Sequence, residues 1–337
     1  MQGGTTMIKL LVWLCTYKCN LNCTHCYVKG RNTMELSTEK ALKLISEIAE
    51  VNPRRFSISG GEPLLRKDLF QLLQASRSFG INTSIVTNGL LLREKEAKKL
   101  SSLGVHVYIS LDAASRKTAS KIRGEEAWSL ALRAIENMRN AGTEFSTIMT
   151  VMQENYLEAG KFVKYSAEIE AEYASLIPVI PSGAAREKTI KPDQLIQAYR
   201  LAEEKAEELG YPVSFWCTPY LKWIKKSKYI YVGGCPDNAI DIDPEGNTLL
   251  CDVLTIKINN VIKIGLKRAL NEYMKHPLSL KFKNPSNLTG KCRSCKYREK
   301  CGGGCRARAL LAYGNFSSPD PLCPLHTEVA APLNRSN

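Results

Sequence analysis

The chain has 337 residues, of which 44% are hydrophobic and 24% charged, with 12 cysteines and a formal net charge of +14. We find neither a leader segment nor an apolar run of about 18 residues, so we expect a soluble cytoplasmic protein without a membrane partner. In a reducing compartment, clustered cysteines favour metal ligands over disulfides.

Short apolar runs alternate with amphipathic stretches through the first half of the chain. The run Ile8 to Leu14 has strand length, and a helical stripe follows Ser37, a plausible helix cap. The alternation then predicts strands at 55–59, 83–87, 105–111, 145–151 and 173–177, with helices at 68–79, 93–103, 127–141 and 157–169. Six strand–helix units predict an α/β fold, a partial (β/α)6 TIM-like barrel two units short of the complete form.

The second half has a different organisation. Residues 192–209 are predicted to form a charged helix that connects two parts of the chain. Beyond it the alternation is lost, while eight of the twelve cysteines fall within 213–337, so metal should hold this region together more than an apolar core does. We expect a barrel domain over 1–185, a helical linker over 186–216 and a small metal-stapled domain over 217–337.

Polar or glycine-rich segments follow the first four predicted strands, at the edge where ligands bind in a parallel barrel. The first segment is CNLNCTHCY, and the others are GGEP at 60–63, TNG at 87–89 and SLD at 110–112. Three cysteines spaced CxxxCxxC can hold a cubane iron–sulfur cluster while one iron stays open. Zinc with an open fourth position is the alternative, because His25 lies inside the motif. The cysteines in question are Cys19, Cys23 and Cys26.

These segments together resemble the radical S-adenosylmethionine (SAM) superfamily: CxxxCxxC followed by an aromatic residue, GGEP, and six βα units in order. The resemblance implies a [4Fe-4S] cluster that binds SAM at its open iron and cleaves it reductively to a 5′-deoxyadenosyl radical, which abstracts hydrogen from a substrate. It also implies these cofactor-binding residues: Tyr27, Gly60, Gly61, Glu62, Pro63, Asn88, Ser110, Asp112 and Arg123.

The resemblance assigns a role to several of these residues. The two glycines would let the backbone approach the methionine moiety of SAM, and Glu62 would hold its ammonium group. Asp112 could accept hydrogen bonds from the ribose, and Arg123 could pair with the SAM carboxylate. Asn88 and Ser110 would contact the methionine or the ribose of SAM. For these two, and for Asp112 and Arg123, the alternative is a strand-end cap or a surface charge.

The cysteines of the second half resemble the SPASM extension of radical SAM enzymes, CX9–15GX4C, then CX2CX5CX3C, then a final cysteine. This resemblance implies two auxiliary iron–sulfur clusters of the [4Fe-4S] type. The distal cluster would be fully ligated by Cys292, Cys295, Cys301 and Cys323. The nearer cluster would be held by Cys235, Cys251 and Cys305. Its fourth ligand would be Cys217, or that iron would stay open to substrate or water.

Asp252 directly follows Cys251. In anaerobic sulfatase maturases, which also have a SPASM extension, an Asp at the corresponding place serves as a base. A carboxylate beside a cluster could take up a proton after hydrogen abstraction, so Asp252 is the candidate catalytic residue. The alternative is an exposed Asp in a loop.

The positive charge is concentrated late in the chain: between Cys217 and Cys323, Lys and Arg outnumber Asp and Glu by ten. A basic zinc-stapled protein that binds nucleic acid would explain this charge. It would not explain GGEP, the half barrel or the SPASM spacing, and clusters bound by thiolates would absorb much of the excess. Nucleic acid is therefore not an expected partner.

We expect a radical SAM/SPASM oxidoreductase that receives electrons from a donor such as ferredoxin or flavodoxin. The substrate would be a peptide or a tetrapyrrole, with sulfatase-maturase-like protein modification as the alternative. CGGGCRARAL resembles most closely the enzymes that trim haem precursors or mature peptide-derived cofactors, although it has one glycine more than their usual run. About seven residues precede the first strand, so a leader peptide would need a separate recognition protein or direct docking.

Overall fold

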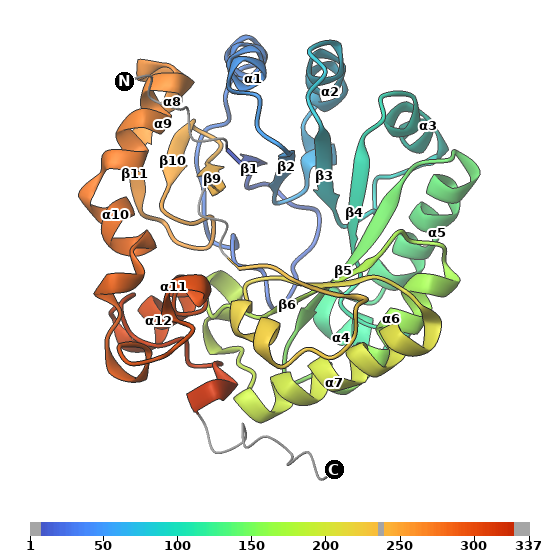
Figure 1. The fold of residues 1–337 in the computed structure, drawn as a ribbon. Helices are drawn as coiled ribbons and strands as arrows, with labels where there is room; N and C mark the ends of the chain where they lie inside the picture. Colours follow the sequence, from blue (N-terminus) through green and yellow to red (C-terminus); the bar gives the residue numbers. More distant parts are fainter. Residues whose placement is uncertain (1–7, 235–238, 327–337) are drawn as a thin grey trace.

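A computed structural model describes residues 8–234 and 239–326 of the chain. Its strands form one curved sheet in the order β11-β10-β9-β1-β2-β3-β4-β5-β6-β7-β8, with helices around the outside (Figure 1). The strands are β1 Leu10–Thr16, β2 Phe56–Gly60, β3 Thr83–Thr87, β4 His106–Ser110, β5 Phe145–Val151, β6 Ala174–Pro178, β7 Val213–Phe215, β8 Ile230–Val232, β9 Ala239–Ile242, β10 Asn247–Leu249 and β11 Lys257–Asn260.

Helices follow most of the barrel strands, and the rest gather near the end of the chain. The first group is α1 Thr38–Val51, α2 Leu69–Ser78, α3 Glu94–Ser102, α4 Arg116–Arg123, α5 Ala127–Asn140, α6 Ala159–Glu168 and α7 Pro192–Leu209. The second group is α8 Val261–Ile264, α9 Leu266–Lys275, α10 Pro277–Lys283, α11 Arg298–Cys301 and α12 Arg306–Tyr313. Ser37 caps α1 as predicted, because its side chain accepts a hydrogen bond from the Lys40 amide.

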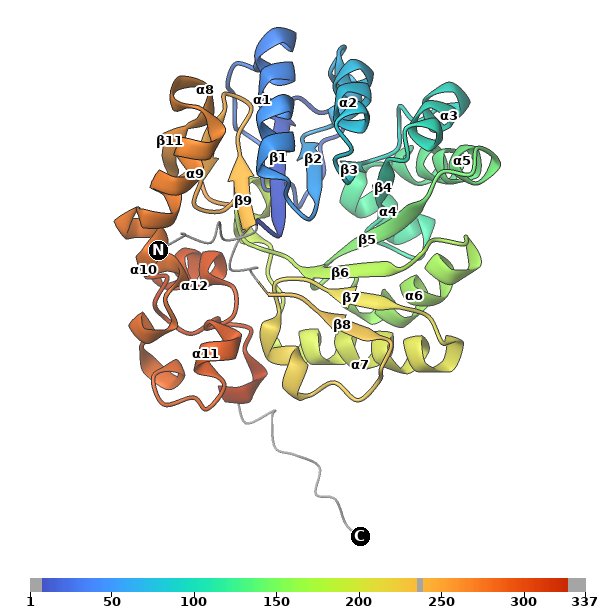
Figure 2. The ribbon, with the colours of Figure 1, turned by 45° about the horizontal axis from the view of Figure 1, so that its top comes forward.

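The predicted partial barrel is confirmed. Strands β1 to β6 pair in parallel in chain order, and β7 and β8 extend the same parallel sheet. At the other end, β9 pairs in parallel with β1, and β10 and β11 follow antiparallel. Figure 2 shows β9 beside β1 and, across the opening, β7 and β8 beyond β6. The C-terminal part therefore contributes strands to the barrel sheet.

The helix expected as a connector, α7, belongs to the outer layer of the barrel. It packs against α6 and buries one face, formed by Leu195, Ile196, Ala198, Tyr199, Ala202 and Ala206. It lies between β6 and β7, so it forms one more βα unit. Residues 186–216 thus pack as part of the barrel.

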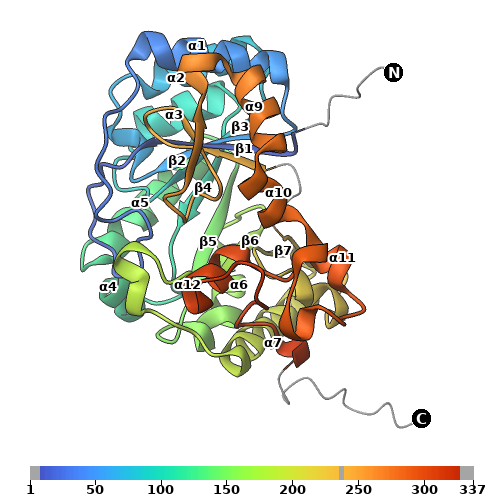
Figure 3. The same ribbon diagram turned by 90° about the vertical axis from the view of Figure 1, so that its left-hand side faces the viewer.

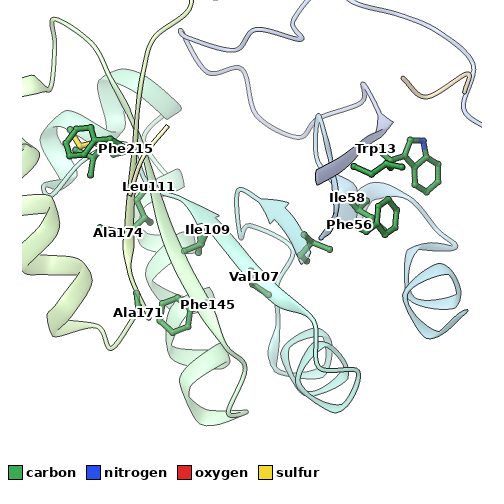
Figure 4. Packing of buried hydrophobic residues seen from close by; sticks show 14 of the residues in the cluster. Trp13, Phe56, Ile58, Val107, Ile109, Leu111, Phe145, Ala171, Ala174 and Phe215 are labelled. Atoms are coloured by element: carbon green, nitrogen blue, oxygen red, sulfur yellow. The ribbon is translucent and has the colours of Figure 1, made fainter. Parts of the chain in front are cut away.

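Alternation along the strands separates residues of the apolar outer layer from residues that face the interior cavity. In β2, Phe56 and Ile58 are fully buried in the main core, whereas Ser57 and Ser59 line the interior cavity. Figure 4 shows Phe56 and Ile58 close to Trp13 of β1. The same pattern recurs in β4, where Ile109 is in the core and Ser110 lines the cavity. The barrel interior is therefore open and lined by both polar and apolar side chains, unlike the packed interior of a closed eight-stranded barrel.

The last helices form a small lobe beside the barrel opening. Figure 3 shows α11 and α12 together, at the end of the molecule away from α1 and α2. A second, smaller apolar core belongs to this lobe and includes Leu250, Phe282 and Cys305. Among the described residues, no helix is both long and apolar enough to cross a bilayer.

Candidate active site

One cavity of about 1480 Å³ connects the carboxyl ends of the barrel strands with the C-terminal lobe. At one end lies the loop after β1, residues 17–27, which we call the cysteine loop and which contributes Cys19, Cys23 and Cys26. At the other end lie Cys217, Cys251 and Cys305, which we call the proximal set. A substrate in this cavity could face both groups of thiols.

The three thiols of the cysteine loop are close enough for their charges to act on one another. Burial raises the pKa of Cys23 to about 11, and the neighbouring Cys26 and Cys19 thiolates add to this rise. Burial also raises the pKa of Cys19, although hydrogen bonds from Leu21 and Asn88 oppose it. Free thiolates here would be destabilised, so bound iron or zinc would compensate their charge. The donor set fits a three-cysteine metal centre.

The cysteine loop is anchored by a buried ion pair at the end of β4. Asp112 is fully buried, and its Oδ2 accepts from Nε of Arg123 at 2.7 Å and lies 2.9 Å from Nε2 of His25. Its Oδ1 accepts from the Thr150 amide at 2.6 Å. Although burial acts the other way, Arg123 and His25 hold the pKa of Asp112 well below its usual range. Asp112 thus stays charged and fixes the histidine that lies between two of the cysteines.

These contacts change two expected roles. Asp112 does not line the cavity, because its carboxylate is already engaged by His25, Arg123 and Thr150. Arg123 does line the cavity, but two of its nitrogens are held by Asp112. The structure therefore places Asp112 behind the site as support, with Arg123 between it and the cavity.

Gly60 and Gly61 line the cavity, but the chain needs glycine there because of close backbone packing. A Cβ on Gly60 would lie 2.1 Å from the carbonyl oxygen of Thr16, and one on Gly61 would lie 2.2 Å from that of Lys18. The Gly61 amide donates to the Thr16 carbonyl at 2.8 Å. The glycines thus press the loop after β2 against the start of the cysteine loop.

Glu62 and Pro63 are both buried and do not line the cavity. Oε1 of Glu62 accepts from the Thr87 hydroxyl at 2.7 Å and from the Leu64 amide at 3.0 Å, and Oε2 accepts from the Asn88 amide at 2.8 Å. Burial raises its pKa, while these hydrogen bonds oppose the rise. Glu62 therefore joins the ends of β2 and β3 and does not face a ligand in the cavity.

Asn88, Ser110 and Tyr27 all line the cavity beside the cysteine loop. The side-chain amide of Asn88 donates to Oδ1 of Asn20 at 2.8 Å and lies 3.8 Å from Sγ of Cys19. The hydroxyl of Tyr27 donates to Oδ2 of Asp252 at 3.1 Å. Tyr27 thus reaches from the cysteine loop to the proximal set.

Asp252 lines the cavity next to a second carboxylate that the sequence did not single out. Asp241 in β9 also lines the cavity, and its Oδ2 accepts from the Asp252 amide at 2.9 Å. Burial raises the pKa of Asp252, and burial followed by the charge of Asp252 raises that of Asp241 well above its usual range. One carboxylate oxygen of each residue lies within 4.8 Å of the other residue's, and like charges this close disfavour ionisation of both groups at once.

The proximal set shows how the structure favours thiolates at the other end of the cavity. A hydrogen bond from Cys217 lowers the pKa of Cys305 to about 7 in spite of burial, and Arg308 contributes. Cys217 has a left-handed backbone, with φ of 56°, which points to a constrained position. Cys251 packs in the same small core as Cys305. Cys235 falls outside the described residues.

Several buried hydrogen-bond donors beside the proximal set have room for an additional acceptor atom. Nη1 of Arg308, the Tyr220 hydroxyl and the Thr218 hydroxyl are buried without a hydrogen-bond partner among the described residues. Unpaired buried donors cost about 1–3 kcal/mol each. Sulfur atoms of a cluster would supply such acceptors.

Four cysteines near the end of the chain, which we call the distal set, also act on one another. Burial raises the pKa of Cys292 to about 11, and the charges of Cys301 and Cys295 add to it. Burial raises the pKa of Cys323 to about 12, and the charges of Cys301 and Cys292 add to this rise. The amides of Gly304 and Gly303 donate to Cys301. The distal set comprises Cys292, Cys295, Cys301 and Cys323, which are all free thiols.

Comparison with known families and proteins agrees with this geometry. Residues 13–165 match the model of the Radical SAM superfamily. The chain is 27% identical over 348 residues to the AdoMet-dependent heme synthase of Methanosarcina barkeri, covering 96% of this chain and 98% of that protein. It is 28% identical over 327 residues to the mycofactocin maturase MftC of Mycolicibacterium smegmatis, covering 93% of this chain and 82% of that protein.

Two solved structures share the fold. Streptococcus suis SuiB bound to its precursor peptide SuiA superposes with a TM-score of 0.76 at 18% identity, covering 94% of this chain and 75% of SuiB. The enzyme anSMEcpe with bound AdoMet and a peptide superposes with a TM-score of 0.72 at 22% identity, covering 93% of each chain.

Proposed function

The chain is a radical SAM enzyme, and from that premise we propose that it is a SPASM-type oxidoreductase that modifies a tetrapyrrole or a peptide. The observation that carries this proposal is the single cavity that joins the cysteine loop to the proximal set. We propose that residues 1–185 form the radical-generating part, which 186–216 extend by one more βα unit, and that 217–337 form the part that binds auxiliary clusters.

The cysteine loop would hold a [4Fe-4S] cluster with one open iron through Cys19, Cys23 and Cys26. With SAM bound, this centre supplies the 5′-deoxyadenosyl radical that abstracts hydrogen. The protein contributes placement: Asp112 holds His25 and Arg123, and Glu62 holds the backbone of Asn88. Gly60, Gly61, Asn88, Ser110, Tyr27 and Arg123 line the space next to this loop, so they are the proposed SAM contacts.

The other end of the cavity would hold two auxiliary clusters. Cys251, Cys305 and Cys235 would bind the nearer one with Cys217 as the fourth ligand, and the distal set would bind the second. Asp252 is the proposed base, because it lies in the cavity beside Cys251 with its carboxylate positioned by Tyr27. Electrons would come from a small donor such as ferredoxin or flavodoxin. The clustered cysteines suit the reducing cytoplasm.

Two substrate classes have separate support. The similarity to the heme synthase of Methanosarcina barkeri extends over 96% of this chain and 98% of that protein, which favours a tetrapyrrole. Four basic residues that line the cavity would suit the carboxylates of a tetrapyrrole: Lys9, Arg55, Lys222 and Lys300. The similarity to the mycofactocin maturase favours a peptide. Protein modification of the sulfatase-maturase kind would place Asp252 in the same role.

The test uses protein purified without oxygen, SAM and a strong one-electron reductant. We expect release of 5′-deoxyadenosine, which replacing Cys19, Cys23 and Cys26 by Ala abolishes. Deuterated carboxylate-bearing tetrapyrroles and deuterated peptides are then supplied separately, and the true class transfers its label into 5′-deoxyadenosine. Release that continues in the triple variant would overturn the assignment of the cysteine loop.

A further inference from the structure

A buried ion pair lies where the proximal and distal sets meet. Arg308 and Asp320 are 2% and 3% exposed. Nε of Arg308 donates to Oδ1 of Asp320 at 3.1 Å, and Nη2 donates to Oδ2 at 2.7 Å. Burying two charges this deeply costs free energy unless each charge is paired and its remaining polar atoms are hydrogen-bonded.

Asp320 holds backbone beside one cysteine of each set. Its Oδ2 accepts from the Cys305 amide at 2.7 Å, and its Oδ1 accepts from the Leu322 amide at 3.0 Å, next to Cys323. A Cβ on Gly304 would lie 2.4 Å from Cβ of Asp320, so the glycine lets the chain pass close to this carboxylate. Asp320 therefore serves both sets.

Arg308, in contrast, is directed to the proximal set. Its Nη2 also donates to the Cys217 carbonyl at 2.6 Å, and its backbone amide donates to Sγ of Cys305 at 3.5 Å. Its remaining nitrogen, Nη1, is buried and has no acceptor among the described residues. Tyr220, which is fully buried and carries an unpaired hydroxyl, lies close enough for the charges of Arg308 and Cys305 to act on it.

We propose that Arg308 is a positioning residue that holds Cys217 and Cys305 and gives the proximal auxiliary cluster a higher reduction potential, by donating from Nη1 to its sulfur. The inference rests on the proposed auxiliary clusters. A buried cation and hydrogen bonds to sulfur both favour the reduced, more negative form of a cluster. The negative charge of Asp320 would act on the distal cluster, which Arg308 would not contact directly. The proximal cluster would therefore be the easier of the two to reduce.

Arg306 provides a matched control in the same helix. It is 3% exposed, and its guanidinium donates to the carbonyls of Phe316 at 2.8 Å and Asn284 at 3.3 Å. Its charge acts on Cys292 of the distal set. Arg306 also lines the cavity that holds the proximal set, but its charge acts on the distal set, so replacing it should move the proximal potential less than replacing Arg308.

The experiment is a redox titration followed by electron paramagnetic resonance, in protein whose Cys19, Cys23 and Cys26 are replaced by Ala so that only auxiliary clusters contribute. A further Cys292→Ala/Cys295→Ala variant assigns the proximal signal. We expect Arg308→Gln to move the proximal midpoint to more negative potential at unchanged iron content, Arg308→Lys to restore part of the shift, and Arg306→Gln to give a smaller shift than Arg308→Gln.

An unmoved proximal midpoint in Arg308→Gln at full iron content would overturn the inference, because the pair would then be structural only. If Arg308→Gln loses iron, Arg308→Lys decides: it keeps the positive charge but loses the Nη1 donor, so it should give a smaller negative shift, and no shift at full iron content would overturn the proposal. Absence of any auxiliary signal in the parent protein would instead contradict the proposed function itself.

Discussion

The hydroxyl of Tyr27 donates a hydrogen bond of 3.1 Å to the carboxylate of Asp252, which lies 225 residues further along the chain. Tyr27 follows Cys26, and Asp252 follows Cys251, so this contact joins the two thiol-bearing ends of the cavity. Arg31 reinforces the junction by donating to the Asp252 carbonyl at 2.7 Å. Residues next to the thiols at the two ends of the cavity are thus in direct contact.

The first prediction concerns Asp252 as base. Asp252→Asn keeps an oxygen that can accept from Tyr27 but removes the proton acceptor. We expect product formation to fall roughly 10²- to 10⁴-fold, while release of 5′-deoxyadenosine without product continues. The measurement is the ratio of product to 5′-deoxyadenosine over one time course.

Tyr27→Phe is the companion variant, since it removes only the contact to Asp252. It should lower the same ratio by a smaller factor. Equal ratios in wild type and Asp252→Asn would show that another group takes the proton, and Asp241 is then the next residue to replace.

The second prediction concerns the support behind the cysteine loop. His25→Phe keeps a ring but loses the 2.9 Å contact to Asp112. Because partners behind a metal ligand typically contribute roughly 10- to 100-fold, we expect the rate of SAM cleavage to fall by that order. Iron bound by the C-terminal lobe should stay the same.

Asp112→Asn tests the same contact from the other side. If the two residues act together, the double variant should be little worse than either single one. Additive losses would show that His25 and Asp112 act on the loop independently.

The third prediction concerns the glycine pair. In Gly61→Ala the new Cβ would meet the Lys18 carbonyl oxygen at 2.2 Å, so backbone must shift. We expect a loss of about 1–3 kcal/mol in the free energy of unfolding, measured by denaturant titration. Gly233→Ala is the control, because its Cβ would find the nearest atom, the Phe215 carbonyl oxygen, at an ordinary 3.6 Å. Equal stability of the two variants would contradict this packing role.

The barrel could be predicted from sequence because its signals are local. The run TSIVT occupies β3 as expected, at Thr83–Thr87, and Pro192–Leu209 is the predicted helix. The extension of the sheet could not be predicted, because β7 and β8 have only three residues each. The place of β9 beside β1 depends on pairing such as Leu11 with Ile240, which no local pattern indicates.

In the site, the sequence located the segments but not the direction of each side chain. Glu62 and Asp112 lie in the expected loops, yet both are buried behind the cavity by hydrogen bonds to residues from other strands. Asp241 was missed, because a carboxylate in the short stretch AIDI carries no motif. Its place beside Asp252 exists only once β9 joins the sheet.

The fourth prediction concerns pH. Burial, followed by the charge of Arg55, lowers the pKa of His106 from 6.5 to about 4. Glu172 lies 3.6 Å from Nδ1, but this exposed carboxylate does not offset burial. As the pH falls, His106 therefore takes up its proton at a higher pH in the unfolded chain than in the folded one. The contribution of neutral His106 to the free energy of unfolding is complete above pH 6.5 and is lost toward pH 4, by at most about 3 kcal/mol.

His106→Gln checks this account, since it removes the titrating ring. Unfolding by denaturant at several pH values between 5 and 7 should show a shallower pH dependence in the variant than in wild type. Identical slopes would mean that His106 titrates alike in the folded and unfolded states.

The fifth prediction separates the distal set from radical formation. Replacing Cys292 and Cys295 by Ala should lower total iron and product formation while sparing part of SAM cleavage, because neither thiol contributes to the cysteine loop. Iron content equal to wild type would remove the distal cluster from the proposal.

The central claim is that the cysteine loop holds a cluster with one iron open to SAM. The most direct measurement is the electron paramagnetic resonance spectrum of reduced protein that retains Cys19, Cys23 and Cys26 but lacks the distal and proximal thiols, recorded with and without SAM carrying ¹⁷O in its carboxylate. We predict a cluster signal that SAM shifts and that the label broadens. A signal indifferent to SAM, or no cluster signal at all, would contradict the account.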